Sequence, residues 1–494
     1  MNKSDTGNYT VTFEVSAGAA DFHEIERRME GARQVYNTCL SHCFKLHRGL
    51  QANPQWQKNL CEILKLTKRS AATPENKARV KVLRDENRKI EKEAGLTEYC
   101  LHSYALNVAK HMGIPLGSNQ MQKAATFAWR AFDRWRFGNA KKVRFKKRGE
   151  FITIENKSSR DGLRLVGTTV VWPALGVPTM RMPIIVRRND KYAEQTFLDR
   201  TKFIRLFIRE IRGKKRIFIQ AVKEGTPPLK DRKAGSEVRP FGIDLSPSTL
   251  VAWTRDKAII EELAPDCKNI DKELRRIRRA IDRSRRTTNP DAFNENGTIK
   301  KGAKFVHSKR CEKLYAKARE LFRKQAAIRK QSHEKTANRI IALSTNILVE
   351  DTPVTSWARR SKKTKVSRKD GGVQRKKRYG KTIAEKAPEM LLDILAMKLG
   401  CLGKSIRRVD SFKVKASQYD HSSGLCTKKH LSERWAVVDG NRVQRDLYSA
   451  FLIAHVTGEK LDTIDRDACC EDWENYLKTQ SEALGACDRK FGIF

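Results

Sequence analysis

The sequence predicts a multidomain α/β protein in which an antiparallel β-barrel, interrupted by a helical insertion, precedes a second α/β domain. Three observations predict this architecture. The 494 residues exceed the size at which single cores usually stop growing, about 250–300 residues. Short alternating segments separated by turn residues recur between residues 138 and 240, as in small β-barrels. Beyond them, short apolar strands alternate with long helical patterns.

The barrel is predicted to be split along the chain. The alternating segment YTVTFEV at 9–15 stands alone, and helical patterns then occupy residues 17–137. Strand patterns return in KKVRFKKRG, FITIENK, TTVVWP, RMPIIVRR, FIRLFIREI and RIFIQAVKEG. The economical interpretation is one barrel of the oligonucleotide-binding type, formed by residues 1–16 and 138–240, with 17–137 inserted into it.

A new domain is predicted to begin at residue 241 with FGIDLSPSTLVAWT, which reads as a strand, an acid, a turn and a second strand. Two long basic helices and the strand NILVE complete its first part, 241–357. The remainder, 387–456, follows a basic segment at 358–386 that we expect to be mobile without a ligand. Residues 457–494 read as a more acidic tail.

The charge of the chain points to a polyanionic partner. Lysine and arginine number 102 against 57 acids, which gives a formal charge of +45. Nucleic acid is favoured over a membrane surface, because counterion release rewards phosphate binding and no window holds the roughly 18 apolar residues of a spanning helix. The N-terminus has no signal-peptide pattern, and the eleven cysteines form no CxxC pair, so we expect a reducing, cytoplasmic location.

Three acids stand where a metal-dependent phosphodiesterase needs them. Asp244 and Glu350 each end an apolar strand, and Asp446 begins a helix with an apolar face. Phosphodiester hydrolysis by two hard cations requires oxygen ligands that converge on one point. An isolated acid at such a position is more often a solvated cap, and Asp351 and Asp410 are neighbouring alternatives. The hypothesis therefore depends on the three acids acting together.

Several motifs resemble those of the TnpB transposon-encoded nucleases and the type V CRISPR effectors. The acids match as GIDLS at Asp244, ILVE at Glu350 and, with the largest departure, RDLYSA at Asp446. The other similar segments, across roughly residues 127–455, are NAKKVRFKK, GKKRIFIQAVKEGTPP, LRRIRRAIDRSRR, RKKRYGKTI and VKASQYDH.

This resemblance implies an RNase H-like RuvC nuclease domain in the C-terminal half, a wedge barrel and a helical recognition insertion. It further implies a guide RNA, a double-stranded target DNA with a short flanking motif, and a prokaryotic, nucleoid-associated location when DNA is bound. Asp244, Glu350 and Asp446 would hold two Mg²⁺ ions and perform catalysis.

Zinc is not expected, although the family commonly has a four-cysteine ribbon before the last acid. The corresponding residues 417–438 contain His421, Cys426 and His430 in no standard ligand spacing. Cys39 and Cys43, near His42 and His47, repeat at helical spacing and are predicted to pack in a core.

Basic and aromatic side chains are candidates for contacts with phosphates and unpaired bases. The arginine-rich helix around Ile277 is equally consistent with a solvated face, whereas Trp357 beside Arg359 is the favoured stacking residue. The candidate nucleic-acid-binding residues are Arg130, Arg134, Lys146, Lys147, Arg275, Arg276, Arg278, Arg279, Arg283, Arg285, Arg286, Trp357, Arg359, Arg360, Lys362, Lys363, Arg375, Lys376, Lys377 and Arg378.

Two alternatives to an RNA-guided DNA endonuclease stay open. A transposase or recombinase could use the same RNase H-like site without a guide, because acid spacings of 106 (350 minus 244) and 96 (446 minus 350) suit it equally. A nuclease-inactive nucleic-acid-binding protein is the other. The sequence does not distinguish a monomer from a homodimer, or a transposon from a CRISPR context.

Overall fold

The computed structural model describes residues 7–67, 73–174, 176–228, 234–351, 353–359, 379–428 and 433–486. The chain divides into two compact units, Met1–Pro228 and Leu229–Phe494, and each is described by itself. The division falls before the expected boundary at 240, because Ser236 and Pro240 already pair with Ser344 and Asn346 in the sheet of the second unit. The chain is thus a multidomain α/β protein with a large antiparallel sheet.

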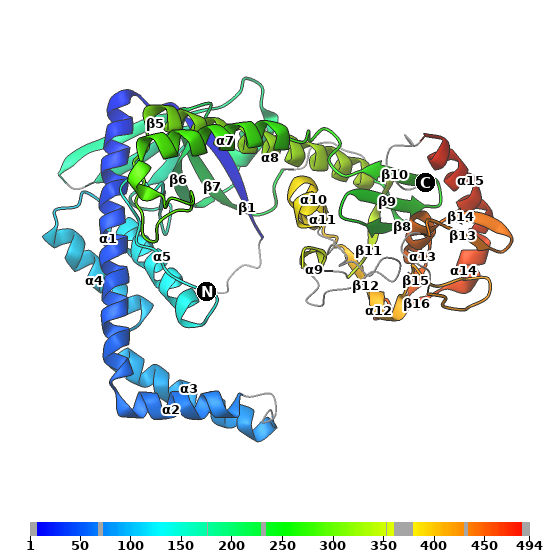
Figure 1. Ribbon diagram of the computed structural model, residues 1–494, viewed down its shortest axis with the longest axis horizontal. Coiled ribbons are helices and arrows are strands. Elements are labelled where there is room, and N and C mark those ends of the chain that lie inside the picture. The colour runs from blue at the N-terminus through cyan, green and yellow to red at the C-terminus, as the bar shows by residue number, and fades with distance from the viewer. Residues whose placement is uncertain are drawn as a thin grey trace. The chain divides into compact units, whose positions relative to one another are not determined.

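The first unit contains a seven-stranded antiparallel sheet in the order β2-β6-β7-β1-β5-β4-β3 (Figure 1). Its strands are β1 (Asn8–Val15), β2 (Thr153–Glu155), β3 (Arg164–Val166), β4 (Thr169–Ala174), β5 (Val177–Ile185), β6 (Thr201–Ile211) and β7 (Lys214–Glu224). Although β1 precedes the others by more than a hundred residues, it pairs with β7 along its whole length and with β5 at its end. Among the described residues no ladder joins β2 to β3, so the expected closure into a barrel stays a prediction.

The expected strand KKVRFKKRG is wrong, because residues 142–147 have no regular structure. The backbone of this segment instead pairs with side chains of helix α1 (Ala19–Gln51). The carbonyl of Lys146 accepts hydrogen bonds from Arg33 and Asn37, and its N–H donates to Asn37. An alternating pattern alone therefore did not make a strand where helix side chains satisfied the backbone.

Five helices lie between β1 and β2. After α1 come α2 (Pro54–Leu66), α3 (Pro74–Glu93), α4 (Glu98–His111) and α5 (Ser118–Arg136). Their starts follow capping rules: Asn53, Thr73 and Thr97 each accept a hydrogen bond from the N–H three residues later. Gly95, in the left-handed region with φ +76°, follows α3, where glycine commonly ends a helix.

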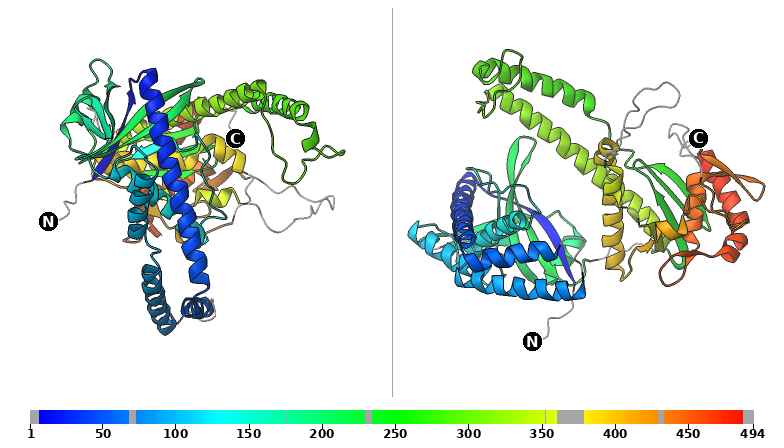
Figure 2. Two further views of the ribbon diagram at one scale, coloured as in Figure 1. Left: turned by 90° about the vertical axis from the view of Figure 1, so that its left-hand side faces the viewer. Right: turned by 60° about the horizontal axis from the view of Figure 1, so that its bottom comes forward.

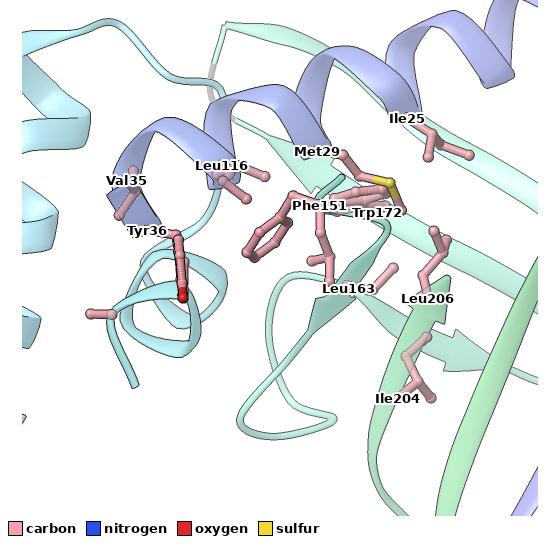
Figure 3. Packing of buried hydrophobic residues seen from close by; sticks show 14 of the residues in the cluster. Ile25, Met29, Val35, Tyr36, Leu116, Phe151, Leu163, Trp172, Ile204 and Leu206 are labelled. Atoms are coloured by element: carbon pink, nitrogen blue, oxygen red, sulfur yellow. The ribbon is translucent and has the colours of Figure 1, made fainter. Parts of the chain in front are cut away.

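The core of this unit forms where α1 covers the sheet. Ile25, Met29 and Tyr36 of α1 pack with Trp172, Leu206 and neighbouring strand residues (Figure 3). Cys39 and Cys43 are buried in the same core, and His42 stacks on Tyr104 with ring centroids 3.9 Å apart. These residues pack as predicted. A short helix that the sequence did not indicate, α6 (Lys191–Leu198), is capped by Asp190.

The second unit is built on a five-stranded sheet in the order β10-β9-β8-β11-β12. Strands β8 (Ser236–Leu245), β9 (Thr249–Thr254) and β10 (Lys257–Glu262) are antiparallel, and β11 (Ser344–Glu350) and β12 (Arg407–Val409) continue the sheet parallel to β8. One face packs against α13 (Arg445–Ala454) and α15 (Trp473–Ala486). The other packs against the end of α8 (Lys309–Leu343) and against α11 (Pro388–Cys401).

Helices α7 (Asp271–Thr288) and α8 form a long hairpin (Figure 2). Ile277 and Ile281 of α7 meet Cys311 of α8 in a small core of their own, which is the predicted apolar face of this basic helix. The remaining elements are η2 (Pro290–Ala292), α9 (Val354–Trp357), α10 (Gly380–Lys386), α12 (Ser411–Val414), β13 (Trp435–Val438), β14 (Asn441–Gln444), β15 (Val456–Thr457), β16 (Thr463–Ile464) and α14 (Arg466–Glu471).

Residues 457–486 are folded, whereas the sequence suggested a tail after residue 456. Trp473 and Tyr476 of α15 are buried in the same core as α13, and the indole N–H of Trp253 donates to the hydroxyl of Thr479 over 3.1 Å. This segment is rich in acids, but its helix α15 also has an apolar face, which the composition alone does not reveal. Within the described residues, no helix has both the length and the apolar character needed to cross a membrane.

Candidate functional site

Asp244 and Glu350 lie side by side at the ends of two neighbouring parallel strands. Ile243 of β8 pairs in register with Val349 of β11, so the two acids occupy the next position on each strand. Ile243 and Val349 are buried in the core on the α11 side. Because side chains alternate along a strand, Asp244 and Glu350 point to the opposite face, the one that α13 covers.

Gly242 allows α13 to lie directly on β8 (Figure 1). A Cβ atom at this position would stand 2.1 Å from the carbonyl oxygen of Ala450 and 2.5 Å from the nitrogen of Ala454. Any side chain would therefore push the helix away from the strand. Asp446 lies in the first turn of this helix, so this glycine sets how closely the third acid approaches the first two.

The start of α13 is fixed by two glutamines, one of them in the segment that read as a tail. The side chain of Gln444 caps the helix by accepting from the N–H of Leu447 over 2.7 Å. The N–H of Gln444 donates to Oε1 of Gln480 over 2.8 Å, and that oxygen also accepts from the hydroxyl of Tyr476. Both glutamines are buried. They position Asp446, and no pattern in the sequence singles out Gln480.

The charges of the three acids act on one another at Asp244. Burial raises the pKa of its carboxyl well above the ordinary value, and the negative charges of Glu350 and Asp446 raise this pKa further. Arg445 lowers the pKa, but not enough to offset the other causes. Among the described residues, no donor makes a hydrogen bond to this carboxylate. Around Asp244 the negative charges of the other two acids therefore outweigh the positive charge of Arg445.

Asp446 has local partners. One carboxylate oxygen lies 3.5 Å from the guanidinium of Arg434 and 3.4 Å from the amide nitrogen of Gln444. In the described part of the chain, no three acidic, histidine or cysteine side chains are already arranged to hold a metal ion. Three like-charged carboxylates repel one another when no cation lies between them, and Asp446 is in contact with Arg434.

The donor chemistry of the site fits magnesium. Three carboxylates from three elements offer hard oxygen ligands, and the raised pKa of Asp244 marks an excess of negative charge that a divalent cation would relieve. Of the alternative acids, Asp410 is occupied as the cap of α12, where it accepts from the N–H groups of Phe412 and Lys413, and Asp351 is exposed.

The segment that resembles a degenerate zinc ribbon uses its histidine in packing. His421 is buried, and its Nδ1 lies 2.7 Å from the hydroxyl of Tyr448, which also accepts from the backbone N–H of His421. Burial lowers the pKa of this imidazole. Cys426 is exposed, and His430 lies outside the described residues. His421 thus supports α13, and hence Asp446, through Tyr448.

The arginines of α7 divide into two groups. Arg285 is half-buried, with its guanidinium 4.0 Å from the ring centre of Phe305, and Arg286 pairs with Asp282 over 2.9 Å and stacks on Phe293. These two hold the tip of the hairpin together. The arginines that are exposed without such packing are Arg275, Arg276, Arg278, Arg279 and Arg283.

Other basic candidates are exposed on the first unit. These are Arg130, Arg134, Lys146 and Lys147. Arg136, on the same helix as Arg130 and Arg134, is largely buried and pairs with Glu91. In the second unit Trp357 is half-buried and Arg359 is exposed. The candidates that lie outside the described residues are Arg360, Lys362, Lys363, Arg375, Lys376, Lys377 and Arg378.

No protein-family model and no curated protein matches the chain. Among solved structures, a Cas12f1–sgRNA–target DNA complex is similar with a TM-score of 0.43 and 11% identity, covering 90% of this chain and 98% of that one. A CRISPR-Cas12f ternary complex gives a TM-score of 0.29 and 12% identity, with coverages of 90% and 82%. A Cas12i1 R-loop complex after target DNA cleavage gives 0.25 and 9%, with coverages of 94% and 64%. Likeness this distant assigns neither a family nor an activity to the chain.

Proposed function

We propose that the chain is an RNA-guided DNA endonuclease whose single RuvC-type site is formed by Asp244, Glu350 and Asp446. The observation that carries the proposal is the placement of the acids: Asp244 and Glu350 end adjoining strands in register, and Asp446 lies in the first turn of the helix that packs on β8. The charges of Glu350 and Asp446 both raise the pKa of Asp244, which supports the same grouping. The sheet supports an RNase H-like interpretation, because an antiparallel β8–β10 meander is continued by the parallel strands β11 and β12.

Each acid has a distinct part in this proposal. Asp244 and Glu350 sit on rigid strands and would hold the ions in place, whereas Asp446 would complete the site from the start of a helix. When bound, two Mg²⁺ ions supply an activated water and stabilise the charge on the leaving oxygen. Arg434 and Arg445 offset part of the negative charge of the acids before the ions bind.

We include a guide RNA and a target DNA in the proposal because several motifs resemble those of TnpB and the type V effectors. The net charge of +45 and the exposed arginines of α7 suit a partner held by its phosphates. On the same basis we propose the basic wedge and recognition segments, the flanking motif and the two Mg²⁺ ions. These features suit an RNA–DNA duplex that is recognised by its backbone rather than its sequence.

The test begins with RNA that copurifies with the protein expressed from its native host or together with its flanking DNA. One abundant structured RNA with a variable end supplies the reagent for a Mg²⁺-dependent cleavage assay. Glu350→Gln should abolish cleavage while target binding persists, and Asp351→Asn, a change at the adjacent exposed acid, should leave cleavage intact. Cleavage that survives Glu350→Gln would refute the site.

A transposase or recombinase predicts a different result in the same experiment. Strand-transfer products formed without any copurifying RNA would favour that alternative. Nucleic-acid binding without any cleavage by the wild type would favour a nuclease-inactive binder, in which Arg434 holds Asp446 permanently.

A further inference from the structure

The first unit contains a cavity of about 470 Å³ where α2 and α3 meet the ends of α1 and α5. Its walls include the apolar side chains of Trp56, Leu60 and Ile63 and the exposed ring of Phe137. Cavities of this size with aromatic walls are typical of sites for small planar groups. None of these residues belongs to the candidate nuclease site.

One residue that lines this cavity, His47, has a buried side-chain nitrogen without a partner among the described residues. His47 is 8% exposed, and among the described residues nothing makes a hydrogen bond with its Nδ1. The ring is held edge-on by Trp56, Phe132 and Trp135, with centroids 5.6 to 5.9 Å away. Burial and the charge of Arg136 lower its pKa, and Glu91 opposes them. A neutral imidazole fixed in this way presents one unused hydrogen-bonding nitrogen, which is costly to leave unmet.

The neighbouring polar groups are already satisfied, so His47 stands out. The carboxylate of Glu91 accepts a hydrogen bond from the indole N–H of Trp56 over 3.1 Å and pairs with the guanidinium of Arg136. Arg136 in turn lies 5.2 Å from the ring centre of Phe137. This arrangement locks the indole and the guanidinium as walls of the cavity. Nδ1 of His47 is closed to solvent, so a ligand in the cavity reaches it only after the imidazole or a neighbouring side chain shifts.

The rim of the cavity is cationic. Arg84 and Arg88 of α3 are exposed and line the opening, and Arg88 shares its charge with Asp85. An apolar peptide side chain would use the walls but neither the rim nor the unmatched nitrogen. A nucleotide uses all three, because its base is flat and carries hydrogen-bonding edges while its phosphate is anionic.

We propose that this cavity captures one unpaired base of a bound nucleic acid, with His47 as its hydrogen-bonding partner and Arg84 at the adjoining phosphate. The inference rests on the nucleic-acid-binding part of the proposed function and is independent of the nuclease part. It assigns a specific role to the helical insertion, which would hold a base extruded from its stack rather than only contact phosphates.

The test uses the full-length protein, freed of nucleic acid at high salt and kept in metal-free buffer. Two probes of about ten units are compared: a single-stranded DNA that is abasic throughout, and the same strand with one central 2-aminopurine. Because their phosphates are equal in number, the difference in affinity reports the base alone. We expect about tenfold tighter binding of the probe with the base, together with quenching of its fluorescence.

Matched variants locate the base. Leu60→Trp fills the cavity and His47→Phe removes the unmatched nitrogen, so both should abolish the tenfold advantage while affinity for the abasic probe stays unchanged. Leu64→Trp is the control, because Leu64 is on the same helix but 60% exposed and does not line the cavity. If Leu60→Trp fails to fold, His47→Phe decides, since a phenyl ring keeps the packing.

Three results would overturn the proposal. Equal affinity of wild type for the two probes would refute base capture while leaving nucleic-acid binding intact. An advantage that survives in both cavity variants would place the base elsewhere. Binding of neither probe would remove the nucleic-acid function as well, so the two failures are distinguishable.

Discussion

Two carboxylates, the buried Glu155 of the first unit and the half-buried Asp244 of the second, have opposite surroundings. Glu155 of the first unit accepts hydrogen bonds from Lys123 over 2.6 Å and from Arg205 over 2.7 Å. Burial would raise its pKa, but these two cations lower it overall. Burial also raises the pKa of Asp244 in the second unit. The charges of two further acids add to this effect, so the pKa is shifted well upward.

The difference separates a structural acid from a candidate functional one. At Glu155 the fold supplies the compensating charge itself, so this site needs nothing from solution. At Asp244 the fold brings negative charges together, and Arg445 offsets them only in part. Clusters of uncompensated charge are costly to a folded chain, and their cost is accepted most often where catalysis needs it.

The largest effect is expected at Asp244, the candidate functional acid. Asp244→Asn removes one carboxylate ligand without changing the shape of the side chain, and we expect cleavage to fall by about 10⁴-fold, as when one member of a catalytic group is lost. Guide and target binding should be retained, as measured by gel shift. Glu155→Gln is the control for general damage and should leave the cleavage of folded protein within about threefold.

The next largest effect is expected on stability, at Glu155, the structural acid. Glu155→Gln leaves Lys123 and Arg205 without their shared carboxylate, and we expect the first unit to lose about 3 kcal/mol of stability, measured by urea denaturation. The pH dependence has a defined sign. Because the folded pKa of Glu155 is lowered, its contribution is present above the unfolded pKa and is lost as the pH falls through the folded pKa.

At Asp244 we expect a smaller change in stability, in the opposite direction. In metal-free buffer, Asp244→Asn should stabilise the protein by about 1 kcal/mol, since it removes a charge that burial and two acids disfavour. Magnesium should stabilise the wild type by about 1.4 kcal/mol at ten times its dissociation constant and should stabilise the variant less. Thermal unfolding with and without Mg²⁺ measures both. Equal stabilisation of the two proteins would mean that the ion binds elsewhere.

The same contrast explains what the sequence could predict. Strand-ending acids and the helix start at Asp446 are local patterns, so Asp244, Glu350 and Asp446 could be proposed from the residues alone. The approach of α13 through Gly242 and the support of its cap by Gln480 depend on contacts between distant segments, and no local pattern encodes them. The strand expected at residues 141–149 failed for the same reason, because its backbone partners are side chains of α1 more than a hundred positions earlier.

The smallest expected effect applies the contrast to the arginines of α7. Arg283 is exposed, so Arg283→Gln should weaken binding to any nucleic acid and lower the slope of log affinity against log salt by about 0.9 for each phosphate that the variant no longer neutralises. Arg285 is stacked on Phe305, so Arg285→Gln should leave that slope unchanged and instead loosen the tip of the hairpin, measured by hydrogen exchange. An unchanged slope in Arg283→Gln would make this arginine part of a solvated face. A lowered slope in Arg285→Gln would mean that this arginine also contacts a phosphate, because the N–H groups at the edge of a guanidinium can bind a phosphate while its face covers a ring.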